Sequence, residues 1–464
     1  MWYSEKKWPL YTKHSVPLSK DIIAKILATP QGERAYGVVE KLFDAGFDTW
    51  WVGGSVRDML MGVISKDIDI ATEARPEQIA KIFMRCDLSS ALLGSVRVGL
   101  GKHLLEVTTF REDDEASDGR HPESVIFGKR EDDAKRRDFT INAIYWHPIS
   151  GELYDPLGGE NDLNENLVRF IGKPAIRIRH DALRILRAVR LRALIDGQYH
   201  PETYRALQEQ VQSVEILSGG RQLEEIEKML KLKHSRRAFE DLWELSILRY
   251  ILPELHACKG IAQPSDYHQE GDVWEHMMRC ISAFQKDDSD DIRMAALFHD
   301  CGKAKTFSLR DRIRFEEHAT ISAQIATDVL TRMQCPRKRT EKIAWLIKHH
   351  MMMSTFLSLG EERKAHWYFH PWFGELLRLF AIDIAGTKPG NDSLLRAIEQ
   401  DFLAFLDRHP RPPKPLMTGE QVMEILGIQP GARVGEVLQL LREAQIRGDI
   451  SSEEDARDMI EKLL

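Results

Sequence analysis

The 464-residue sequence has few cysteines and no long apolar segment. Its five cysteines are scattered without a Cys-x-x-Cys pair, which argues against a thiolate zinc site and a disulfide framework. No apolar run approaches the ~20 residues of a membrane-spanning helix, and the first residues contain no apolar stretch typical of a secretion signal. We therefore expect a cytoplasmic protein without a membrane partner; its oligomeric state is left open.

The sequence also lacks an excess of basic residues. Its 65 Lys and Arg stand against 72 Asp and Glu, so the formal net charge is -7. This balance excludes nonspecific polyanion binding by the whole chain, although local basic surfaces can still bind nucleic acid. With 43% hydrophobic and 30% charged residues the composition is that of a folded protein. Its length predicts roughly two to four domains.

Helical and strand patterns alternate only in the first third of the chain. Short strands are expected over 49–52 and 67–71, a helix over 33–47 and a hairpin over 96–110. Further along, strand patterns nearly vanish and a 3.6-residue period predominates, including one long helix over 177–195. The predicted fold class is therefore a small mixed α/β head followed by several helical domains.

A glycine turn followed by spaced acids lies in the predicted head. Gly53 and Gly54 follow a strand and would let the backbone approach a polyanion closely, and Arg57 adds positive charge. Asp67 and Asp69 are two residues apart on a predicted strand, so their carboxylates project from the same face. Such carboxylates repel one another unless a cation such as Mg²⁺ compensates them.

A third acid supports a catalytic interpretation of this region. Glu106 lies in the apolar-acid-apolar segment Leu105-Glu106-Val107, which is expected to be a strand. Two cations held by such carboxylates can activate an attacking hydroxyl and stabilise a leaving pyrophosphate. The alternative is a solvated edge strand whose acids bind nothing; the upstream glycine turn and Glu106 favour the catalytic interpretation.

The segment from Arg169 to Arg192 forms a local basic surface with eight Lys or Arg and one acid, Asp181. On one continuous helix, Asp181 and Arg184 would share a face. Asp accepts from the exocyclic amine of C or A, and Arg donates to ring nitrogens or to O2, so the pair can select these bases without a template. The alternative is a salt bridge on a solvated helix.

Seven ordered motifs resemble the class II tRNA nucleotidyltransferase/poly(A) polymerase family of the polymerase-β-like superfamily. They read GGSVRD, DIDIAT, LLEVTTFR, SDGRHP, RRDFTINAI, YDPLGG and RILRAVR. The resemblance covers residues 34–232 and points to bacterial CCA-adding enzymes that carry an HD domain. It implies template-independent addition of C, C and A to the tRNA 3′ end from CTP and ATP.

The resemblance also implies roles for individual residues. Asp67 and Asp69 would hold Mg²⁺, Glu106 would be the third catalytic carboxylate, and Asp181 and Arg184 would read the base. Nucleotide contacts are implied for Gly53, Gly54, Arg57, Arg120, Arg137, Asp138, Asn142 and Arg187. The chain departs from the family pattern at His180, where the family has Glu. The loop over 113–122 resembles the flexible loop of enzymes that add the complete CCA end.

A second resemblance, to the HD phosphohydrolase superfamily, rests on His276, the pair His299-Asp300 and Asp383. Imidazole and carboxylate ligands together favour a transition metal such as Ni²⁺ or Mn²⁺ over Mg²⁺. The alternative is a helical spacer that supports tRNA. Lys303 offers a positive charge to a substrate phosphate. His318, and either His349 or His350, are at positions where some HD proteins recruit a second metal.

The motifs predict a sequence of domains along the chain. These are an N-terminal extension (1–21), a nucleotidyltransferase head (22–150), a base-recognising neck (151–200), a helical body (201–260), an HD-type domain (261–388) and a helical tail (389–464). The tail resembles the C-terminal helices with which bacterial CCA-adding enzymes cradle the tRNA elbow; the alternative is a generic helical cap.

Other functions stay open at this level. One is a poly(A) polymerase or an enzyme that adds only A to tRNA. A long basic C-terminal extension would favour poly(A) synthesis, but after residue 415 acids outnumber Lys and Arg. Another is an HD phosphohydrolase acting on 2′,3′-cyclic phosphate ends, which we expect as a secondary rather than the main activity. A non-catalytic RNA-binding module would not need the spaced carboxylates.

Overall fold

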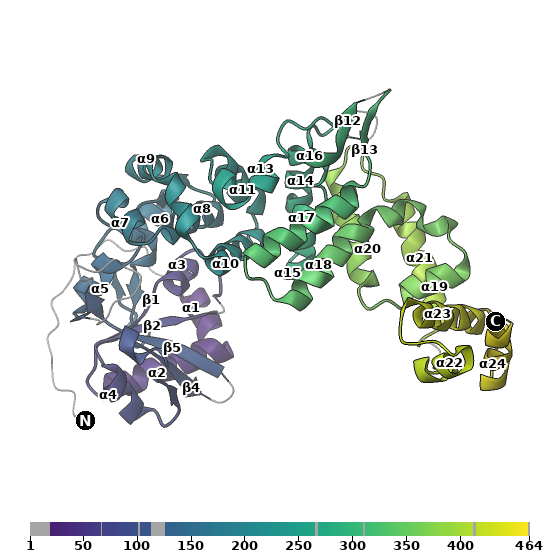
Figure 1. Ribbon diagram of the computed structural model, residues 1–464. Coiled ribbons are helices and arrows are strands. Elements are labelled where there is room, and N and C mark those ends of the chain that lie inside the picture. The colour runs from purple at the N-terminus through teal and green to yellow at the C-terminus, as the bar shows by residue number, and fades with distance from the viewer. Residues whose placement is uncertain are drawn as a thin grey trace. The chain divides into compact units, whose positions relative to one another are not determined.

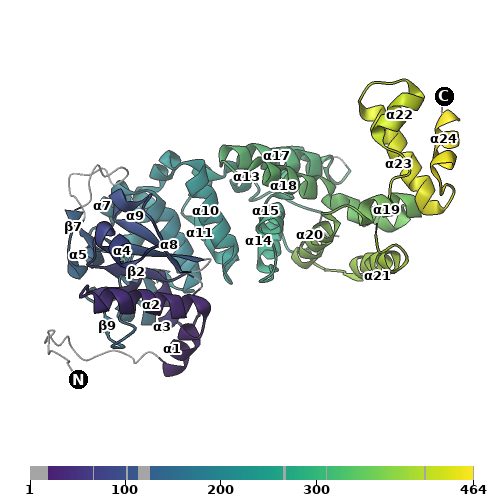
Figure 2. The ribbon, with the colours of Figure 1, turned by 90° about the horizontal axis from the view of Figure 1, so that it is seen from below.

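The computed structural model describes residues 19–65, 67–100, 103–112, 126–264, 268–309, 311–411 and 414–462. The chain divides into two compact units (Figures 1 and 2). The first comprises residues up to Glu225 together with Glu240–Ile251, and the second comprises Ile226–Phe239 and the chain from Leu252 onward. This division falls inside the predicted helical body. Across the described ranges, no helix is both long and apolar enough to span a membrane.

The first unit is built on a seven-stranded mixed sheet. The strand order is β3-β4-β5-β2-β1-β8-β9, and within the described sheet only β2 and β5 pair in parallel. Their bounds are β1 Thr49–Val52, β2 Asp69–Thr72, β3 Cys86–Asp87, β4 Ser95–Leu100, β5 His103–Thr109, β8 Tyr145–Trp146 and β9 Leu153–Tyr154. The predicted strand over 49–52 and the hairpin over 96–110 are confirmed, whereas β2 begins two residues later than expected.

Both faces of this sheet are covered, and all four residues of the central strand β1 are buried. The helices α1 (Lys20–Leu27), α2 (Pro30–Asp44) and α4 (Pro76–Ile82) share a core with Trp51 and Ile70. On the other face, Trp50, Val52, Ala71 and Tyr145 pack with Ala134 of α5 (Arg130–Arg136). Because side chains alternate along a strand, Asp69 lies on the same face as Ala71.

The helices after the sheet contain a break that the periodicity did not reveal. The single helix expected over 177–195 is wrong: α7 (Pro174–His180) ends before Asp181, and α8 (Leu183–Leu194) begins after it. Asp181 has extended backbone angles, φ -153° and ψ 106°, and its Oδ1 accepts from the Leu183 N–H at 3.1 Å. The Asp181 carboxylate thus satisfies an N–H group at the start of α8, where the first N–H groups of a helix have no partner within the helix.

The rest of the first unit is mostly helical. Two short ribbons also occur, β6 (Arg111–Glu112) with β7 (Ile126–Phe127), and β10 (Leu167–Val168) with β11 (Gln198–Tyr199). Its remaining helices are α3 Gly54–Leu60, α6 Gly159–Asn164, α9 Pro201–Glu209 and α12 Leu248–Ile251, while α10 Gly219–Leu230 and α11 Ser235–Glu244 each cross the division between units. Short 3-10 helices occur too, among them Thr140–Asn142 and Val211–Ile216.

The described residues of the second unit are helical apart from one ribbon, β12 (Phe307–Leu309) with β13 (Ile313–Phe315). Its helices are α13 Pro253–His256, α14 Val273–Ser282, α15 Asp290–Phe298, α16 Lys303–Thr306, α17 His318–Arg332, α18 Arg337–His349, α19 Glu361–Tyr368, α20 Phe373–Gly386, α21 Ser393–Arg408, α22 Gly419–Leu426, α23 Ala432–Arg447 and α24 Glu453–Glu461. A 3-10 helix, His350–Ser358, follows α18. The helices α22 to α24 bury a small core of their own.

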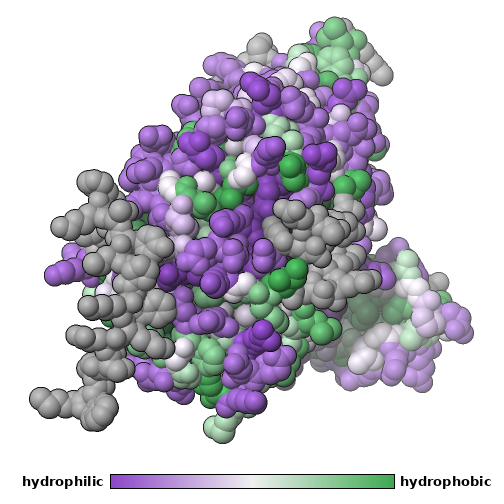
Figure 3. Space-filling model, turned by 90° about the vertical axis from the view of Figure 1, so that its left-hand side faces the viewer, coloured by the Kyte–Doolittle hydropathy of each residue, from purple (hydrophilic) through white to green (hydrophobic). Residues whose placement is uncertain are grey.

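The surface that Figure 3 shows is mainly hydrophilic, and its hydrophobic residues form separate patches. Such a surface agrees with the composition, in which charged residues make up 30%. Scattered apolar side chains of this kind are normal for a water-exposed face.

Candidate functional site

Asp69 lies directly beside the glycine turn. The strand register pairs Asp69 on β2 with Val52 on β1, the residue that precedes Gly53. A Cβ atom on Gly53 would lie 3.5 Å from Asp69 Oδ2 and 3.4 Å from Arg137 Nη1. The Asp69 carboxylate and the Arg137 guanidinium therefore both face the turn, and a residue without a side chain leaves the space between them open.

The three predicted catalytic acids line one pocket of about 370 Å³, together with Arg34 of α2. The parallel pairing of β2 with β5 brings Asp69 level with Glu106. Asp67 and Asp69 are exposed, whereas Ile68 between them is buried, so both acids point away from the apolar core. The strand pairing and the alternation of side chains thus bring the three acids together.

Charge crowding affects Asp69 most. Although Asp69 is accessible from the pocket, the protein atoms around it partly desolvate its carboxylate and raise its pKa; Arg137 opposes this shift, and the charges of Glu106 and Asp67 reinforce it. Carboxylates that repel one another in an accessible pocket are a suitable donor set for a hard divalent cation, whose charge offsets the repulsion. The residues present therefore fit a bound cation at this position.

A chain of polar side chains connects the glycine turn to α8. Arg57 Nη1 donates to Asn142 Oδ1 at 2.6 Å, and Asn142 Nδ2 donates to Asp138 Oδ1 at 3.2 Å. Arg187 Nε, on α8, donates to Asp138 Oδ2 at 2.6 Å. Burial disfavours the charged form of Asp138, but Arg187 and Asn142 hold its pKa at about 2. Four predicted nucleotide contacts thus form one network that fixes α8 to the sheet.

Arg137 is fixed by a second network on the same side of the sheet. Its Nη2 donates to Asp133 Oδ2 at 2.9 Å, and its Nε donates to the Tyr145 hydroxyl at 3.1 Å. Burial disfavours the charge of Asp133, but Arg137 and Arg136 hold its pKa at about 2. Because these contacts occupy Nε and Nη2, they aim Nη1 toward Gly53. A guanidinium held in this way is suited to a phosphate oxygen.

The predicted base-reading residues are positioned by the helix break. Asp181 lies between α7 and α8, and its Oδ2 accepts from Arg221 Nη2 on α10 at 2.8 Å. Arg184, in the first turn of α8, donates from Nη1 to the Arg177 carbonyl at 2.7 Å. Arg221 received no role from the sequence, because it lies 40 residues from Asp181 and its local segment carries no distinctive motif.

The structure describes His180 but not Arg120. His180 is the last residue of α7, directly before Asp181. Arg120 and the loop over 113–122 lie outside the described residues, so the predicted nucleotide contact of Arg120 stays a prediction. The other predicted nucleotide-binding residues of the first unit lie at the glycine turn, in the two networks or at the helix break.

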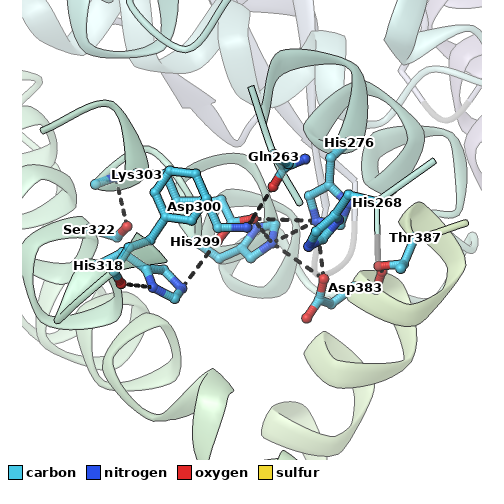
Figure 4. Close-up of polar contacts among 12 residues, drawn as sticks. Gln263, His268, His276, His299, Asp300, Lys303, His318, Ser322, Asp383 and Thr387 are labelled. Atoms are coloured by element: carbon cyan, nitrogen blue, oxygen red, sulfur yellow. Dashed lines mark hydrogen bonds and ion pairs between the residues drawn. The ribbon is translucent and has the colours of Figure 1, made fainter. Parts of the chain in front are cut away.

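In the second unit, four predicted ligand residues converge from three helices (Figure 4). His276 lies on α14, His299 and Asp300 follow α15, and Asp383 lies on α20. His276 Nε2 lies 3.3 Å from His299 Nε2, 3.4 Å from Asp300 Oδ2 and 3.1 Å from Asp383 Oδ1. Donors ~2.1 Å from one ion are separated by roughly this much. The arrangement fits a transition metal.

Neighbouring acceptors orient these imidazoles. His299 Nδ1 donates to the Ala296 carbonyl at 2.8 Å, and His276 Nδ1 lies 3.2 Å from Glu270 Oε1. Such contacts fix the ring and direct Nε2 inward, as is usual for metal-binding histidines. Glu270 also contacts His268 Nδ1 at 2.7 Å. The sequence did not single out Glu270, because it lies in an irregular segment before α14.

Lys303 adds a positive charge beside the predicted metal ligand Asp300. Its Nζ lies 2.7 Å from Asp300 Oδ2 and donates to Gln263 Oε1 at 2.8 Å. Burial disfavours the charged form of Asp300, but Lys303 and His299 hold its pKa well below the usual value. Asp300 is therefore ionised near neutral pH and available as a ligand.

We expect Gly53→Ala to raise the KM for nucleotide and to lower kcat. Gly53 has φ 76° and ψ -137°, a conformation that costs other residues about 1–3 kcal/mol, and the new methyl group would fill the gap beside Asp69 and Arg137. Gly62→Ala is the matched control, because Gly62 has φ 75° but no described atom within 4 Å of its Cβ position. Equal loss of activity in both variants would mean that backbone strain alone is responsible.

Acid should weaken the first unit between about pH 4 and pH 2. Asp133 and Asp138 have pKa values of about 2 in the folded protein, below the ordinary ~3.9, so each contributes about 2 kcal/mol that is present at pH 5 and lost as pH falls through the folded pKa. Urea unfolding followed by tryptophan fluorescence at pH 5, 4 and 3 measures this loss. Asp138→Asn should be less stable at pH 7 and show a shallower fall; an unchanged pH dependence would contradict the argument.

Three family models match the chain. The Poly A polymerase head domain matches residues 49–169, which contain the glycine turn and the three acids. The probable RNA and SrmB-binding site of polymerase A matches residues 198–259. The HD domain matches residues 272–365, which contain His276, His299 and Asp300. The head model thus covers the three acids of the first unit, and the HD model covers the predicted metal ligands of the second unit except for Asp383.

Two relatives match along nearly the whole chain. The A-adding tRNA nucleotidyltransferase of Deinococcus radiodurans is 31% identical over 434 residues, 89% of this chain and 94% of the relative. The CC-adding tRNA nucleotidyltransferase of Thermus thermophilus is 30% identical over 437 residues, 88% of this chain and 92% of the relative. The CCA-adding enzyme of Listeria monocytogenes is 38% identical, but over only 47% of this chain and 56% of the relative.

Solved structures share the fold. The crystal structure of the Bacillus stearothermophilus CCA-adding enzyme in complex with CTP has a TM-score of 0.70 at 24% identity and covers 94% of this chain and 98% of its own. The Thermotoga maritima CCA-adding enzyme complexed with tRNA has a TM-score of 0.52 at 20% identity and covers 94% and 97%. At these identities the likeness concerns the fold.

Proposed function

The chain belongs to the tRNA nucleotidyltransferase/poly(A) polymerase family, and on this basis we propose that it adds C, C and A to the 3′ end of tRNA from CTP and ATP. One observation carries the proposal. The Asp69 carboxylate faces the glycine turn and lines a pocket with Asp67 and Glu106. That arrangement suits transfer of a nucleotide from a triphosphate to a hydroxyl, with release of pyrophosphate.

In the proposed reaction Asp67 and Asp69 would hold Mg²⁺, with Glu106 as the third carboxylate. When bound, Mg²⁺ would lower the pKa of the attacking hydroxyl and offset the charge of the leaving pyrophosphate. The protein itself contributes position: the absence of side chains at the turn lets the triphosphate approach the backbone, and Arg137, held by Asp133 and Tyr145, directs Nη1 to the same place.

Base choice is proposed to rest on Asp181 and Arg184. An Asp carboxylate accepts from the exocyclic amine of C or A and finds no donor at the corresponding carbonyl of U or G, while Arg donates to ring nitrogens or to O2. Arg221 orients the Asp181 carboxylate through its 2.8 Å contact. This gives Arg221 a positioning role in the proposal.

The second candidate is addition of A alone, and the whole-chain match to an A-adding enzyme favours it. Transcripts of one tRNA that end before C74, after one C and after CC separate the candidates when each is incubated with Mg²⁺ and CTP, ATP or both. We expect CTP and ATP together to complete every transcript to CCA. Extension of the CC-ended transcript alone, by one A, would replace our proposal with A addition, and long A tracts from ATP would identify a poly(A) polymerase.

The HD-type site is proposed to bind a transition metal such as Ni²⁺ or Mn²⁺ and to hydrolyse phosphate ends as a secondary activity. The convergence of His276, His299, Asp300 and Asp383 supports this proposal. Terminal 2′,3′-cyclic phosphates are the proposed substrate. One water would open the cyclic diester to a monoester, and a second would release inorganic phosphate, so that both hydroxyls of the terminal ribose are free for nucleotide addition.

A further inference from the structure

Cys280 lies among the predicted metal ligands of the second unit. It is on α14, one helical turn after His276, so both side chains occupy the same face of that helix. Its sulfur, one ring nitrogen each of His276 and His299, and an oxygen of Asp383 all lie within 4.8 Å of one another. Because Cys280 has no cysteine close to it in the sequence, no motif marks it as a ligand.

The distances among these donors fit tetrahedral coordination of one ion. Zinc holds nitrogen and oxygen at ~2.0–2.2 Å and sulfur at ~2.3 Å, which places neighbouring donors roughly 3.3–3.7 Å apart. From His276 Nε2 the separation is 3.3 Å to His299 Nε2, 3.1 Å to Asp383 Oδ1 and 3.6 Å to Cys280 Sγ. The longest of the three is to sulfur, as the longer bond between zinc and sulfur requires.

A glycine on α20 leaves room for this sulfur. A Cβ atom on Gly386 would overlap with Cys280 Sγ and would lie 3.1 Å from His276 Cε1. Gly386 is the last residue of α20 and follows Asp383 by three residues. The helix that supplies the carboxylate therefore also makes space for the thiol of α14.

The surroundings of Cys280 differ from those of an ordinary core cysteine. A buried free cysteine usually acts as a small apolar residue. Cys258, for comparison, contacts the backbone carbonyls of Glu254 and Cys301 at 3.4 and 3.9 Å. The Cys280 side chain is equally buried, but it lies beside imidazole nitrogens and a carboxylate, all of which bind cations. This combination of neighbours is that of a metal ligand.

We propose that Cys280 is a further ligand of the metal ion at the HD-type site, which thereby gains a thiolate beside its imidazoles and carboxylates. The proposal rests on the metal binding proposed above for this site and specifies which ions the site selects. Binding displaces the thiol proton to solvent, because the thiolate is the ligating form. Thiolate and imidazole favour Zn²⁺, whereas Mn²⁺ prefers oxygen ligands. Asp300 Oδ2, 3.4 Å from the Nε2 atoms of both histidines, stays within reach of the same ion.

Cobalt spectroscopy tests the proposal without relying on activity. Co²⁺ bound to a thiolate shows a sulfur-to-metal charge-transfer band in the near ultraviolet, which imidazole and carboxylate ligands do not produce. The parent is the full chain with Asp67→Ala and Asp69→Ala, which removes the proposed cation site of the first unit. It is stripped of metal and titrated with Co²⁺. We expect the band in the parent, and its loss in Cys280→Ser while Co²⁺ is still bound.

The matched control is Cys335→Ser, which should keep the band. Cys335 is also buried in the second unit, but it belongs to none of the ligand groups in the described part of the chain. Co²⁺ bound to the parent without the band, or a band that persists in Cys280→Ser, would overturn Cys280 as a ligand and leave the HD-type site standing. No bound Co²⁺ in the parent would overturn both. Thermal unfolding checks the fold of each variant, and Cys280→Ala is the second variant.

Metal preference gives an independent measurement. Loss of a residue that merely supports a ligand typically lowers metal affinity by about 10–100-fold, so Cys280→Ser should lower the affinity for Zn²⁺ by at least as much. The affinity for Mn²⁺ should fall much less, because sulfur contributes little to its binding. Competition of each ion with a chelating indicator measures both affinities. An equal fall for the two ions would indicate general damage to the site and would overturn the assignment of Cys280.

Discussion

The variant with both Asp67→Ala and Asp69→Ala should lose nucleotide addition to tRNA by on the order of 10³-fold or more. Both side chains are exposed in the same pocket and face away from the apolar core. Their removal relieves charge repulsion at Asp69 rather than breaking a packing contact. The expected loss is therefore one of catalysis, with the fold preserved.

Incorporation of labelled AMP and CMP into a tRNA transcript that lacks its CCA end measures this loss. Asp44→Asn is the matched control, because Asp44 is an exposed acid at the end of α2. Thermal unfolding of all variants shows whether the fold is intact. A folded double variant that keeps a substantial share of wild-type activity would remove the basis for the proposed cation site and for the enzyme mechanism.

The second large effect is expected at the HD-type site. His299→Ala together with Asp300→Ala should abolish hydrolysis of 2′,3′-cyclic phosphate ends and leave nucleotide addition close to wild type. The reason is that all proposed ligand residues of this site lie in the second unit, whereas the three proposed catalytic acids lie in the first. Hydrolysis is followed on an RNA with a 2′,3′-cyclic end in the presence of Ni²⁺ or Mn²⁺.

The double substitution has a structural cost that the controls must separate. Removing Asp300 leaves the buried Lys303 ammonium without its carboxylate, and an uncompensated buried charge is strongly destabilising. His299→Gln alone retains Asp300 and is the milder variant; His349→Ala is the control on the neighbouring surface. Parallel loss of hydrolysis and nucleotide addition in folded variants would refute the independence of the two sites.

Several elements were predictable because their signals are local. The Thr-Trp-Trp-Val segment is a strand with both faces buried, and the 3.6-residue period that predominates after the head predicted the mainly helical second unit. The pattern Asp-Ile-Asp-Ile placed both acids on one side because side chains alternate along any extended chain. Backbone geometry alone fixes such relations.

Other features depended on contacts between distant segments. The 3.6-residue period runs through the break at Asp181 without interruption, and a contact from the distant Arg221 accompanies that break. His349 and His350 are adjacent residues of the same type. They differ in their surroundings, because the His349 ring packs against Trp345 whereas His350 Nε2 lies near Asp300. Likewise the role of Glu270 arises from its contact with His276.

The sequence by itself determined the chemistry that is available: which acids, imidazoles and guanidinium groups the chain carries, and which face of its own strand or helix each one occupies. The tertiary structure decided which of them meet, as when β2 and β5 pair to bring Asp69 level with Glu106. The physical reason is that periodicity describes one element at a time, whereas a site requires atoms from several elements within a few ångströms. That proximity follows from the packing of the whole unit.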